Sequence, residues 1–351
     1  MNTIYENEII ENKMTELLNT RLDARALMTV DSSLSENAGL RKVINRYTYT
    51  GAVETLAKGE KNAVKGTVSF VPEYYDVKRY QQTFEYNDMD AMADPYIVDV
   101  AMQGAVNEIT NEINEEYFEE LSKISTGYSY EGDAVTYSDL VDALALIDCE
   151  VDSDLFIIMG AEGRKQIRKD PDFVAAKQGE IVYSGQFGTI CGIPVIFSKL
   201  IEGGRIIVTN KNAVRFFIKK SASVEQARDI ETKDNTVVYE RHGLIALVDD
   251  TCSVVVGKKI GDLTWTTTGP TGNGKIGFVP DEAYLTHTYV YKINFTGVVF
   301  EGDKLVGWDS VPLNTIITPN AVGDVFTIVE LDSEGKATRK YNYTVTEITN
   351  G

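Results

Sequence analysis

The chain has 351 residues, of which 43% are hydrophobic and 25% are charged. These are ordinary globular values, and the length allows a substantial core in roughly two or three domains. Its 53 acidic and 34 basic side chains give a formal net charge of −19, which favours solubility and argues against a nucleic-acid-binding surface, because such a surface needs clustered Lys and Arg.

Cysteine use and hydropathy indicate the compartment. Cys149, Cys191 and Cys252 are far apart and form no CxxC motif, so we expect small buried thiols in a reducing compartment. The N-terminus has neither a basic region nor an apolar run of signal-peptide length, and no stretch approaches about 18 consecutive apolar residues. We therefore expect a protein that is made in the cytosol and does not span a membrane.

The first predicted element is an amphipathic helix over residues 4–22. Its apolar side chains on one side are Ile9, Ile10, Met14, Leu17, Leu18 and Leu22. A polar, turn-rich segment follows and is predicted to be an extended arm, although the helix would equally suit the first helix of an ordinary core.

A long β-hairpin is predicted over residues 47–86. Both halves are rich in Thr, Val, Tyr and Phe, and the glycine-bearing segment between them carries Lys58, Lys61 and Lys65 at the tip. A two-stranded hairpin is marginally stable in water by itself, so one this long must lie on another surface, either its own or that of a neighbouring copy.

The most regular pattern in the chain predicts a helix over residues 94–124. Asp94 suits an N-cap and Pro95 a first helical turn. Apolar residues then recur at steps of three and four as far as Ile124. At 1.5 Å per residue the helix would be about 45 Å long, far above the average for globular proteins, which suggests a spine.

A second row on this helix is acidic: Glu108, Glu112, Glu115 and Glu119. Like charges four residues apart cost a few tenths of a kcal/mol each, and late in a helix they oppose its dipole. The row is either a solvated face or a contact surface. Our hypothesis for the second case is an inter-subunit contact in which the row meets Lys58, Lys61 and Lys65 of an adjacent copy.

The rest of the chain changes character twice. Residues 137–257 alternate short helices with short strands, a pattern typical of a compact α+β body. Residues 258–351 are rich in Thr, Gly, Tyr and Val without a helical period, which predicts a small β domain with its boundary near residues 257–261.

Motifs for chemistry are few. His242 and His287 fall in separate predicted domains, no Cys and His cluster suits zinc, and the aspartates near Asp88 lack the glycine and the closing glutamate of a calcium loop. The sequence GPTGNGKIG at 269–277 contains GxxxxGK, but Ile276 follows the lysine and Pro280 interrupts the helix that a phosphate loop requires, so a hairpin loop is predicted. We expect no catalytic residue, no cofactor, no metal and no enzymatic activity.

In their order, these segments resemble the major capsid proteins of tailed phages with the Hong Kong 97 type fold. The resemblance covers roughly residues 1–257 and depends on the arm, the hairpin, PEYYDVKRYQQTFEYNDMDAMADPY before the long helix, GTICGIPVIFSK, AVRFFIKKSASVEQARD and VVYERHGLIALVDDTCSVVV. It implies an α+β fold divided as follows: N-terminal arm 1–46, E-loop hairpin 47–86, peripheral domain with spine helix 87–136, axial domain 137–235, closing peripheral strands 236–257, and an accessory β domain, Ig-like or similar, at 258–351.

The resemblance also implies a function and partners. Copies would assemble as pentamers and hexamers into an icosahedral shell around phage double-stranded DNA, which the shell would contact only non-specifically. The hairpin would lie across a neighbouring subunit. The short arm implies a separate scaffolding protein, and a portal protein and a decoration protein are further expected partners. The protein would assemble in the host bacterial cytoplasm and end in the virion capsid, with non-covalent closure. The alternatives are an encapsulin-like nanocompartment shell and a tail or baseplate adhesin that uses the C-terminal β domain.

Overall fold

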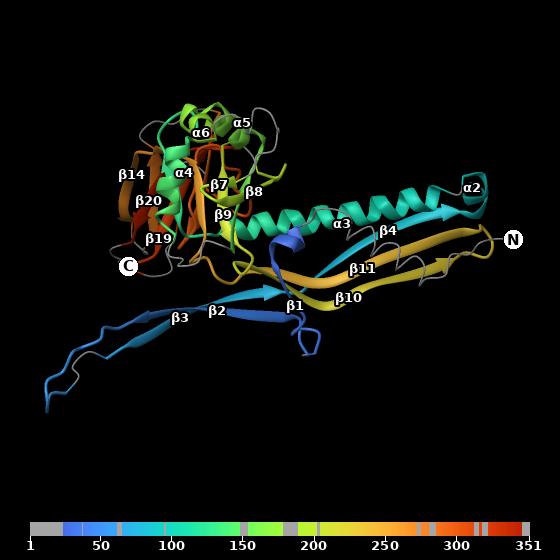
Figure 1. The fold of residues 1–351 in the computed structure, drawn as a ribbon, viewed down its shortest axis with the longest axis horizontal. Helices are drawn as coiled ribbons and strands as arrows, with labels where there is room; N and C mark the ends of the chain where they lie inside the picture. The colour runs from blue at the N-terminus through green and yellow to red at the C-terminus, as the bar shows by residue number, and fades with distance from the viewer. Residues whose placement is uncertain are drawn as a thin grey trace. The chain divides into compact units, whose positions relative to one another are not determined.

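A computed structural model shows the fold (Figure 1). It describes residues 24–36, 38–61, 65–94, 96–147, 154–177, 189–201, 204–271, 275–280, 286–311, 316–317 and 322–345. The chain forms two compact units, one from Met1–Glu120 with Lys211–Asp249 and the other from Leu121–Asn210 with Asp250–Gly351. The helix predicted over 4–22 and Cys149 lie outside the described residues, as does part of the glycine-rich segment 269–277.

The first unit contains a four-stranded sheet in the order β1–β10–β11–β4. Its strands are β1 (Thr29–Asp31), β4 (Lys78–Asn87), β10 (Val214–Arg228) and β11 (Asp234–Leu247), and the 3-10 helix η1 (Ala24–Leu27) precedes β1. β10 and β11 form a long antiparallel hairpin, β4 pairs antiparallel with β11, and β1 pairs parallel with β10. Phe216 of β10 and Val237 and Tyr239 of β11 are fully buried, so this hairpin is part of the unit's core.

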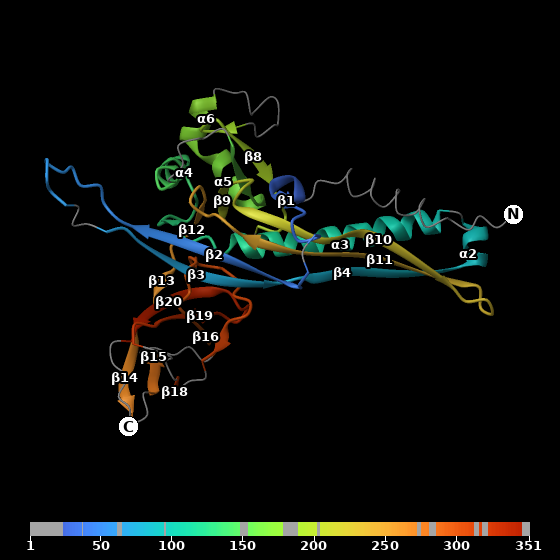
Figure 2. The same ribbon diagram turned by 90° about the horizontal axis from the view of Figure 1, so that it is seen from below.

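Helix α3 (Ile97–Leu121) runs alongside β4, β10 and β11 in both views (Figures 1 and 2). Its buried side chains follow steps of three and four: Val98, Met102, Ala105, Ile109, Ile113, Tyr117 and Leu121. The predicted long helix is therefore confirmed, with shorter ends. Asp94 is the C-cap of the short helix α2 (Asp88–Ala93), and its carboxylate accepts the Tyr96 N–H at 3.0 Å, so α3 begins only after this turn.

The predicted hairpin is displaced. Strands β2 (Arg41–Thr50) and β3 (Thr67–Asp76) pair antiparallel along their whole length, from Arg41 opposite Asp76 to Thr50 opposite Thr67. The ribbon then breaks at Val77, whose N–H donates to the Leu40 carbonyl at 2.8 Å, and β4 pairs with β11 instead. Residues 78–87 thus belong to the four-stranded sheet, and the prediction of one hairpin over 47–86 is wrong for residues 78–86. Asp76, directly before Val77, is the only turn-type residue at the change of partner, and without an accompanying Gly, Pro or Asn it is a weak signal.

The second unit contains a six-stranded sheet in the order β5–β12–β9–β6–β8–β7. The strands are β5 (Gly127–Tyr130), β6 (Leu155–Met159), β7 (Thr189–Ile190), β8 (Ile193–Phe197), β9 (Ile206–Asn210) and β12 (Val254–Lys258), accompanied by helices α4 (Tyr137–Leu144), α5 (Ala161–Lys169) and α6 (Pro171–Lys177). Thr136 and Asp139 form a capping box at the start of α4. A core that includes Leu140, Ile157 and Phe173 packs helices on strands, which confirms the predicted α+β body for residues 137–210. The prediction is wrong for residues 211–249, whose long strands β10 and β11 belong to the first unit.

The described residues after Lys258 form strands joined by turns and loops, without a helix among them, as the sequence predicts (Figure 2). One sheet has the order β13–β20–β19–β16–β17, and a second has the order β14–β15–β18. The strands are β13 (Gly261–Asp262), β14 (Trp265–Thr271), β15 (Lys275–Pro280), β16 (Thr288–Ile293), β17 (Asp309–Ser310), β18 (Ile316–Ile317), β19 (Val325–Leu331) and β20 (Ala337–Thr344). Lys275 of the lysine-bearing loop motif begins β15, so the described part of that motif is in a β-hairpin.

This β region is joined closely to the six-stranded sheet within the second unit. A β-carbon on Gly257 would lie 2.3 Å from the Phe300 ring, and one on Gly127 would lie 2.6 Å from Val298. Only glycine therefore permits this approach of the segment around Phe300. The Arg205 guanidinium also lies 3.3 Å from the Asp303 carboxylate and 5.5 Å from the Phe300 ring centre.

The cysteines differ from the sequence prediction of buried thiols. Cys191 is a free cysteine but is exposed, at the turn between β7 and β8, and its φ of 51° is positive. Cys252 is disulfide-bonded. The expectation of small buried thiols is therefore wrong for both described cysteines.

Candidate functional site

The β2–β3 hairpin exposes one apolar face. Cross-strand partners in an antiparallel ribbon lie on the same side, and three such pairs here are apolar or aromatic. The six side chains, referred to below as the hairpin's apolar face, are Val43 with Tyr74, Tyr47 with Phe70, and Tyr49 with Val68. All six are exposed, Tyr49 by 70% and Tyr47 by 68%, although large apolar side chains gain most from burial.

The opposite face anchors the base of the hairpin. Ile44 is buried against Phe217, Leu244 and Ala246 of β10 and β11. The Lys42 ammonium lies 4.8 Å from the centre of the Phe217 ring. The ribbon is thus fixed to its own unit at one end while its apolar face remains open.

The tip of the hairpin is a turn that presents the predicted lysines. Pairing ends at Thr50 and Thr67, and the Glu60 N–H donates to the Ala57 carbonyl at 3.1 Å. Gly59 has a φ of 95°, a conformation that glycine supplies without strain. Lys58, Lys61 and Lys65 are all exposed around this turn.

The exposed side of α3 has two halves. Steps of three and four on its solvent side give one row, the exposed stripe of α3: Ile97, Val100, Gly104, Glu108, Glu112, Glu115 and Glu119. The N-terminal half is apolar, with Val100 exposed by 66%, and the exposed Met89, Met92 and Tyr96 precede it in the chain. The C-terminal half is the predicted acidic row.

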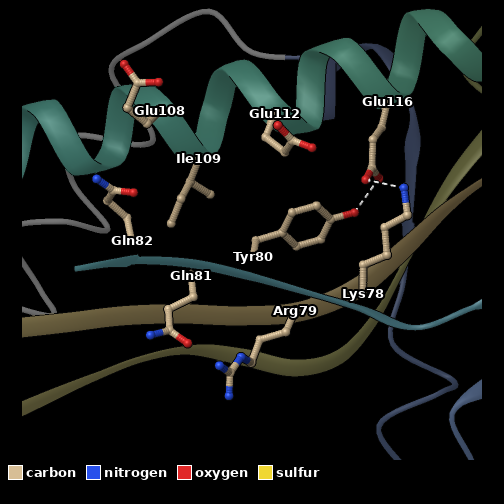
Figure 3. Close-up of a pocket in the computed structure, with 9 residues that line it drawn as sticks. All are labelled: Lys78, Arg79, Tyr80, Gln81, Gln82, Glu108, Ile109, Glu112 and Glu116. Atoms are coloured by element: carbon tan, nitrogen blue, oxygen red, sulfur yellow. Dashed lines mark hydrogen bonds and ion pairs between the residues drawn. The ribbon is translucent and has the colours of Figure 1, made fainter. Parts of the chain in front are cut away.

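A groove of about 360 Å³ separates the acidic row from β4. Its lining from α3 is Glu108, Ile109, Glu112 and Glu116, and its lining from β4 is Lys78, Arg79, Tyr80, Gln81 and Gln82. Figure 3 shows Tyr80 and Lys78 pointing from the strand toward Glu116, while Arg79 and Gln81 point to the other side of the strand. This alternation is the period of two expected of a strand.

Glu116 of α3 forms hydrogen bonds across the groove to two side chains of β4. The Lys78 ammonium donates to it at 2.7 Å, and the Tyr80 hydroxyl donates to its other oxygen. Burial and the charge of Glu116 raise the pKa of Tyr80 above its usual value. Burial by itself would lower the pKa of Lys78, but the hydrogen bond and the charge of Glu116 leave it raised.

Glu120 ties the same helix to two further strands. Its carboxylate accepts from the Leu247 N–H at 3.1 Å and from the Tyr75 hydroxyl at 3.2 Å. Burial and the charge of Glu120 raise the pKa of Tyr75. The two buried glutamates of α3 are therefore structural, whereas Glu108, Glu112, Glu115 and Glu119 are exposed.

The sequence identified the exposed row but missed Glu116 and Lys78. The cation that the structure places on α3 comes from β4 of the same chain, at Lys78. The only turn-type residue just before Lys78 is Asp76, which by itself is too weak a signal to predict this pairing. The proposed contact of Lys58, Lys61 and Lys65 with another copy's Glu108, Glu112, Glu115 and Glu119 stays a prediction.

Neither a metal-ligand cluster nor a membrane-spanning helix is found in the described ranges. Within them no group of His, Cys, Asp and Glu is arranged to hold a metal ion. The His242 ring lies 3.6 Å from the carboxylate of Glu240, two residues earlier on β11. The His287 ring lies 3.2 Å from the carboxylate of Glu330 on β19. None of the helices that the structure describes is long and apolar enough to cross a membrane.

Comparison with known proteins gives one relative and a set of similar folds. No protein-family model matches the chain. A major capsid protein of Staphylococcus phage phiMR11 is 21% identical over 271 residues, which cover 74% of this chain and 97% of the relative. The match covers nearly the whole length of that relative and supports a place for the chain among the phage major capsid proteins.

Solved structures agree on the fold of this capsid protein. The capsid of a native GTA particle superposes with a TM-score of 0.52 at 8% identity, covering 67% of this chain and 89% of that one. A chain from Microbacterium phage Oxtober96 gives a TM-score of 0.50 at 12% identity, covering 66% and 90%. At these identities the likeness shows the fold alone, which is a mixed α+β capsid fold.

Proposed function

We propose that this chain builds an icosahedral phage shell as pentamers and hexamers around packaged double-stranded DNA, through a subunit of the Hong Kong 97 type. The observation that carries the proposal is the hairpin's apolar face. Six exposed apolar side chains on one anchored ribbon form a surface that a solitary chain in water leaves unburied, and such patches mark interaction sites. A closed shell uses each such contact once per copy, so modest contacts add up.

We propose further that the tip lysines and the acidic row are partners between copies. Lys58, Lys61 and Lys65 lie at the free end of the hairpin, and the Glu108 to Glu119 row lies on an exposed helix face. The −19 net charge makes copies repel each other, so a basic tip on an acidic row would oppose that repulsion locally. The role is structural and non-catalytic.

The division into subdomains and the accessory domain are part of this proposal. The hairpin corresponds to β2–β3, with bounds shifted from the sequence prediction, and α3 corresponds to the spine helix. The axial domain would be residues 137–210 and not the predicted 137–235, because β10 pairs with β1 and β11 in the first unit. Residues 258–351 would form an accessory β domain, Ig-like or similar. A separate scaffolding protein, a portal protein and a decoration protein are proposed partners, assembly in the host cytoplasm is proposed, and contact with DNA would be non-specific.

Electron microscopy of the purified chain, with and without neighbouring gene products, tests the proposal. We expect closed particles. Tubes or fibres would favour the tail adhesin, and a peptide cargo bound inside closed particles would favour the nanocompartment. A chain that stays monomeric under every assembly condition would overturn the proposal.

A charge test examines the tip. The double variant Lys58→Glu with Lys61→Glu should impair assembly, because it would place like charges against the acidic row. The double variant Lys199→Glu with Lys211→Glu changes the net charge equally at exposed positions outside the hairpin and should assemble. Equal assembly of both double variants, measured by sedimentation, would remove the tip contact from the proposal.

A further inference from the structure

The direction of the β2–β3 hairpin depends on contacts at its base. The ribbon leaves the sheet at the hydrogen bond between Val77 and Leu40, and Ile44 packs against the core beside it. From Tyr75 to the end of the pairing at Thr67 the ribbon extends by eight residues, or about 27 Å at about 3.4 Å per residue. A tilt of about 10° at the base would therefore move that end by about 5 Å, which is one strand spacing.

One contact at the base is a hydroxyl between two carboxylates. The Tyr75 hydroxyl lies 2.8 Å from the Glu73 carboxylate of the hairpin and 3.2 Å from the Glu120 carboxylate of α3. The two carboxylate oxygens are therefore no more than the sum of these distances, 6.0 Å, apart. Two anions this close repel each other unless a donor lies between them. The hydroxyl donates its proton to either oxygen, so it replaces a repulsion between hairpin and helix by an attraction.

We propose that Tyr75 and Glu120 are positioning residues, which fix the direction of the hairpin in the free chain and so prepare it for assembly. Glu120 suits this role because it is buried on α3, and the oxygen that faces Tyr75 also accepts the Leu247 N–H of β11 at 3.1 Å. One carboxylate oxygen thus joins the helix, the sheet and the hairpin. The inference rests on the proposed shell function and names the residues that prepare the hairpin for it.

The surroundings of Tyr75 support this role. Burial and the charge of Glu120 raise the pKa of Tyr75, so the hydroxyl keeps its proton at neutral and mildly alkaline pH. The Arg46 guanidinium lies 3.3 Å from the Glu73 carboxylate and offsets part of its charge. The Tyr75 ring packs against the core that contains Ile44, so the hydroxyl can be removed while the packing of the ring remains.

A fixed direction matters because assembly uses only hairpins that point the right way. The apparent affinity of a contact falls in proportion to the fraction of chains in the competent conformation. A hydrogen bond to a charged group is strong enough to change such a population about tenfold. Preorganisation of this kind strengthens association without adding a contact between copies.

Helix α3 also provides a matched control for a test. The Tyr80 hydroxyl donates to Glu116 of the same helix, but Tyr80 is on β4 in the four-stranded sheet. Tyr80→Phe therefore removes the same kind of bond without changing the base of the hairpin.

Distances within the free chain measure the direction of the hairpin. One spin label is attached at Thr67→Cys on β3 and the other at Glu225→Cys on β10, both exposed positions, in a Cys191→Ser background. Cys252 is disulfide-bonded, and the background chain without introduced cysteines gives the blank signal. The chain is kept below the concentration at which it assembles, so double electron–electron resonance gives the distances within one copy.

We expect Tyr75→Phe to broaden the distance distribution by about 5 Å, the displacement of a tilt of about 10°. Tyr80→Phe should leave the width unchanged. Adding Glu73→Gln to Tyr75→Phe should narrow the distribution again, because the repulsion is removed and the new amide can donate to Glu120. A loss of packing would not be rescued in this way. An unchanged width in Tyr75→Phe would overturn the positioning role.

Assembly of the same variants tests what the fixed direction is for. Tyr75→Phe should raise the protein concentration needed for assembly about fivefold, measured by light scattering, with little change in the thermal midpoint. A broadened distribution with unchanged assembly would overturn the link between hairpin direction and assembly. A parent chain that forms no shells would overturn the proposed function, while the distances would still decide whether Tyr75 and Glu120 fix the hairpin.

Discussion

Two long hairpins in the first unit have opposite surroundings. The β10–β11 hairpin buries Phe216, Val237 and Tyr239, and β4 covers one of its edges. The β2–β3 hairpin pairs Tyr47 with Phe70 in the same antiparallel manner, yet leaves both rings exposed. The same kind of element thus serves folding in one place and remains available for assembly in the other. Substitutions should therefore affect the stability of the chain in the first hairpin and association of copies in the second.

The largest expected effect is loss of stability from Phe216→Ala. Phe216 is fully buried, with the Tyr80 ring centre 6.5 Å and the Arg241 guanidinium 4.7 Å from its own ring centre. We expect the free energy of unfolding to fall by about 3–5 kcal/mol because a cavity replaces the ring. The same substitution at exposed Phe70 is the matched control and should change it by less than about 0.5 kcal/mol. Chemical denaturation measures both, and equal losses would contradict the comparison.

Substitutions in the exposed β2–β3 hairpin should change the association of copies and leave the stability of the chain unchanged. The double variant Tyr47→Ser with Phe70→Ser keeps the fold but removes two aromatic anchors from the apolar face. We expect the protein concentration needed for assembly to rise at least about tenfold, since interface aromatics commonly contribute more than about 1 kcal/mol each. Light scattering measures that concentration. Unchanged assembly with unchanged stability would show that this face is not an interface.

A smaller effect concerns alkaline pH and the groove beside β4. The pKa of Tyr80 is raised in the folded chain, so above the unfolded value near 10 the unfolded state loses a proton that the folded state keeps. Stability is therefore highest below pH 10 and should fall above it, by up to about 1.4 kcal/mol per pH unit for this group. Urea unfolding measured between pH 9 and 11 gives this fall in the free energy of unfolding, and Tyr80→Phe should make it less steep. An unchanged slope would contradict the assignment.

The smallest expected effect is at the base of the exposed hairpin. Arg41 and Asp76 form an ion pair at 2.6 Å, but both side chains are mostly exposed. Exposed pairs contribute little because water and salt screen them. Arg41→Ala should leave the thermal midpoint and the assembly yield within experimental scatter. A marked loss of either would mean that the pair is covered by another copy.

Periodicity predicted what depends on local sequence. The steps of three and four from Val98 to Leu121 predicted α3, and the same period predicted the row of glutamates on its solvent side. The lysines at the hairpin tip were predicted in the same way, from a glycine-bearing loop between two β-rich runs.

Strand partners could not be predicted because they depend on distant residues. The run from Thr67 to Asn87 is rich in strand-forming residues on both sides of Asp76, so the sequence does not show that pairing changes from β2 to β11 at Val77. Glu116 was missed for the same reason: it differs from Glu115 and Glu119 only in facing β4, and that strand was assigned to the hairpin. The close approach of Phe300 to Gly257 also joins segments that sequence patterns treat separately.

That last contact bears on where the chain can be extended or cut. Because the Phe300 ring occupies the space where any other residue than glycine at 257 would project, the C-terminal strands are wedged into the body that carries them. Inserted peptides should be tolerated at a turn such as that at Gly335, whereas cutting the chain at residue 258 would remove Val298 and Phe300, which pack on Gly127 and Gly257.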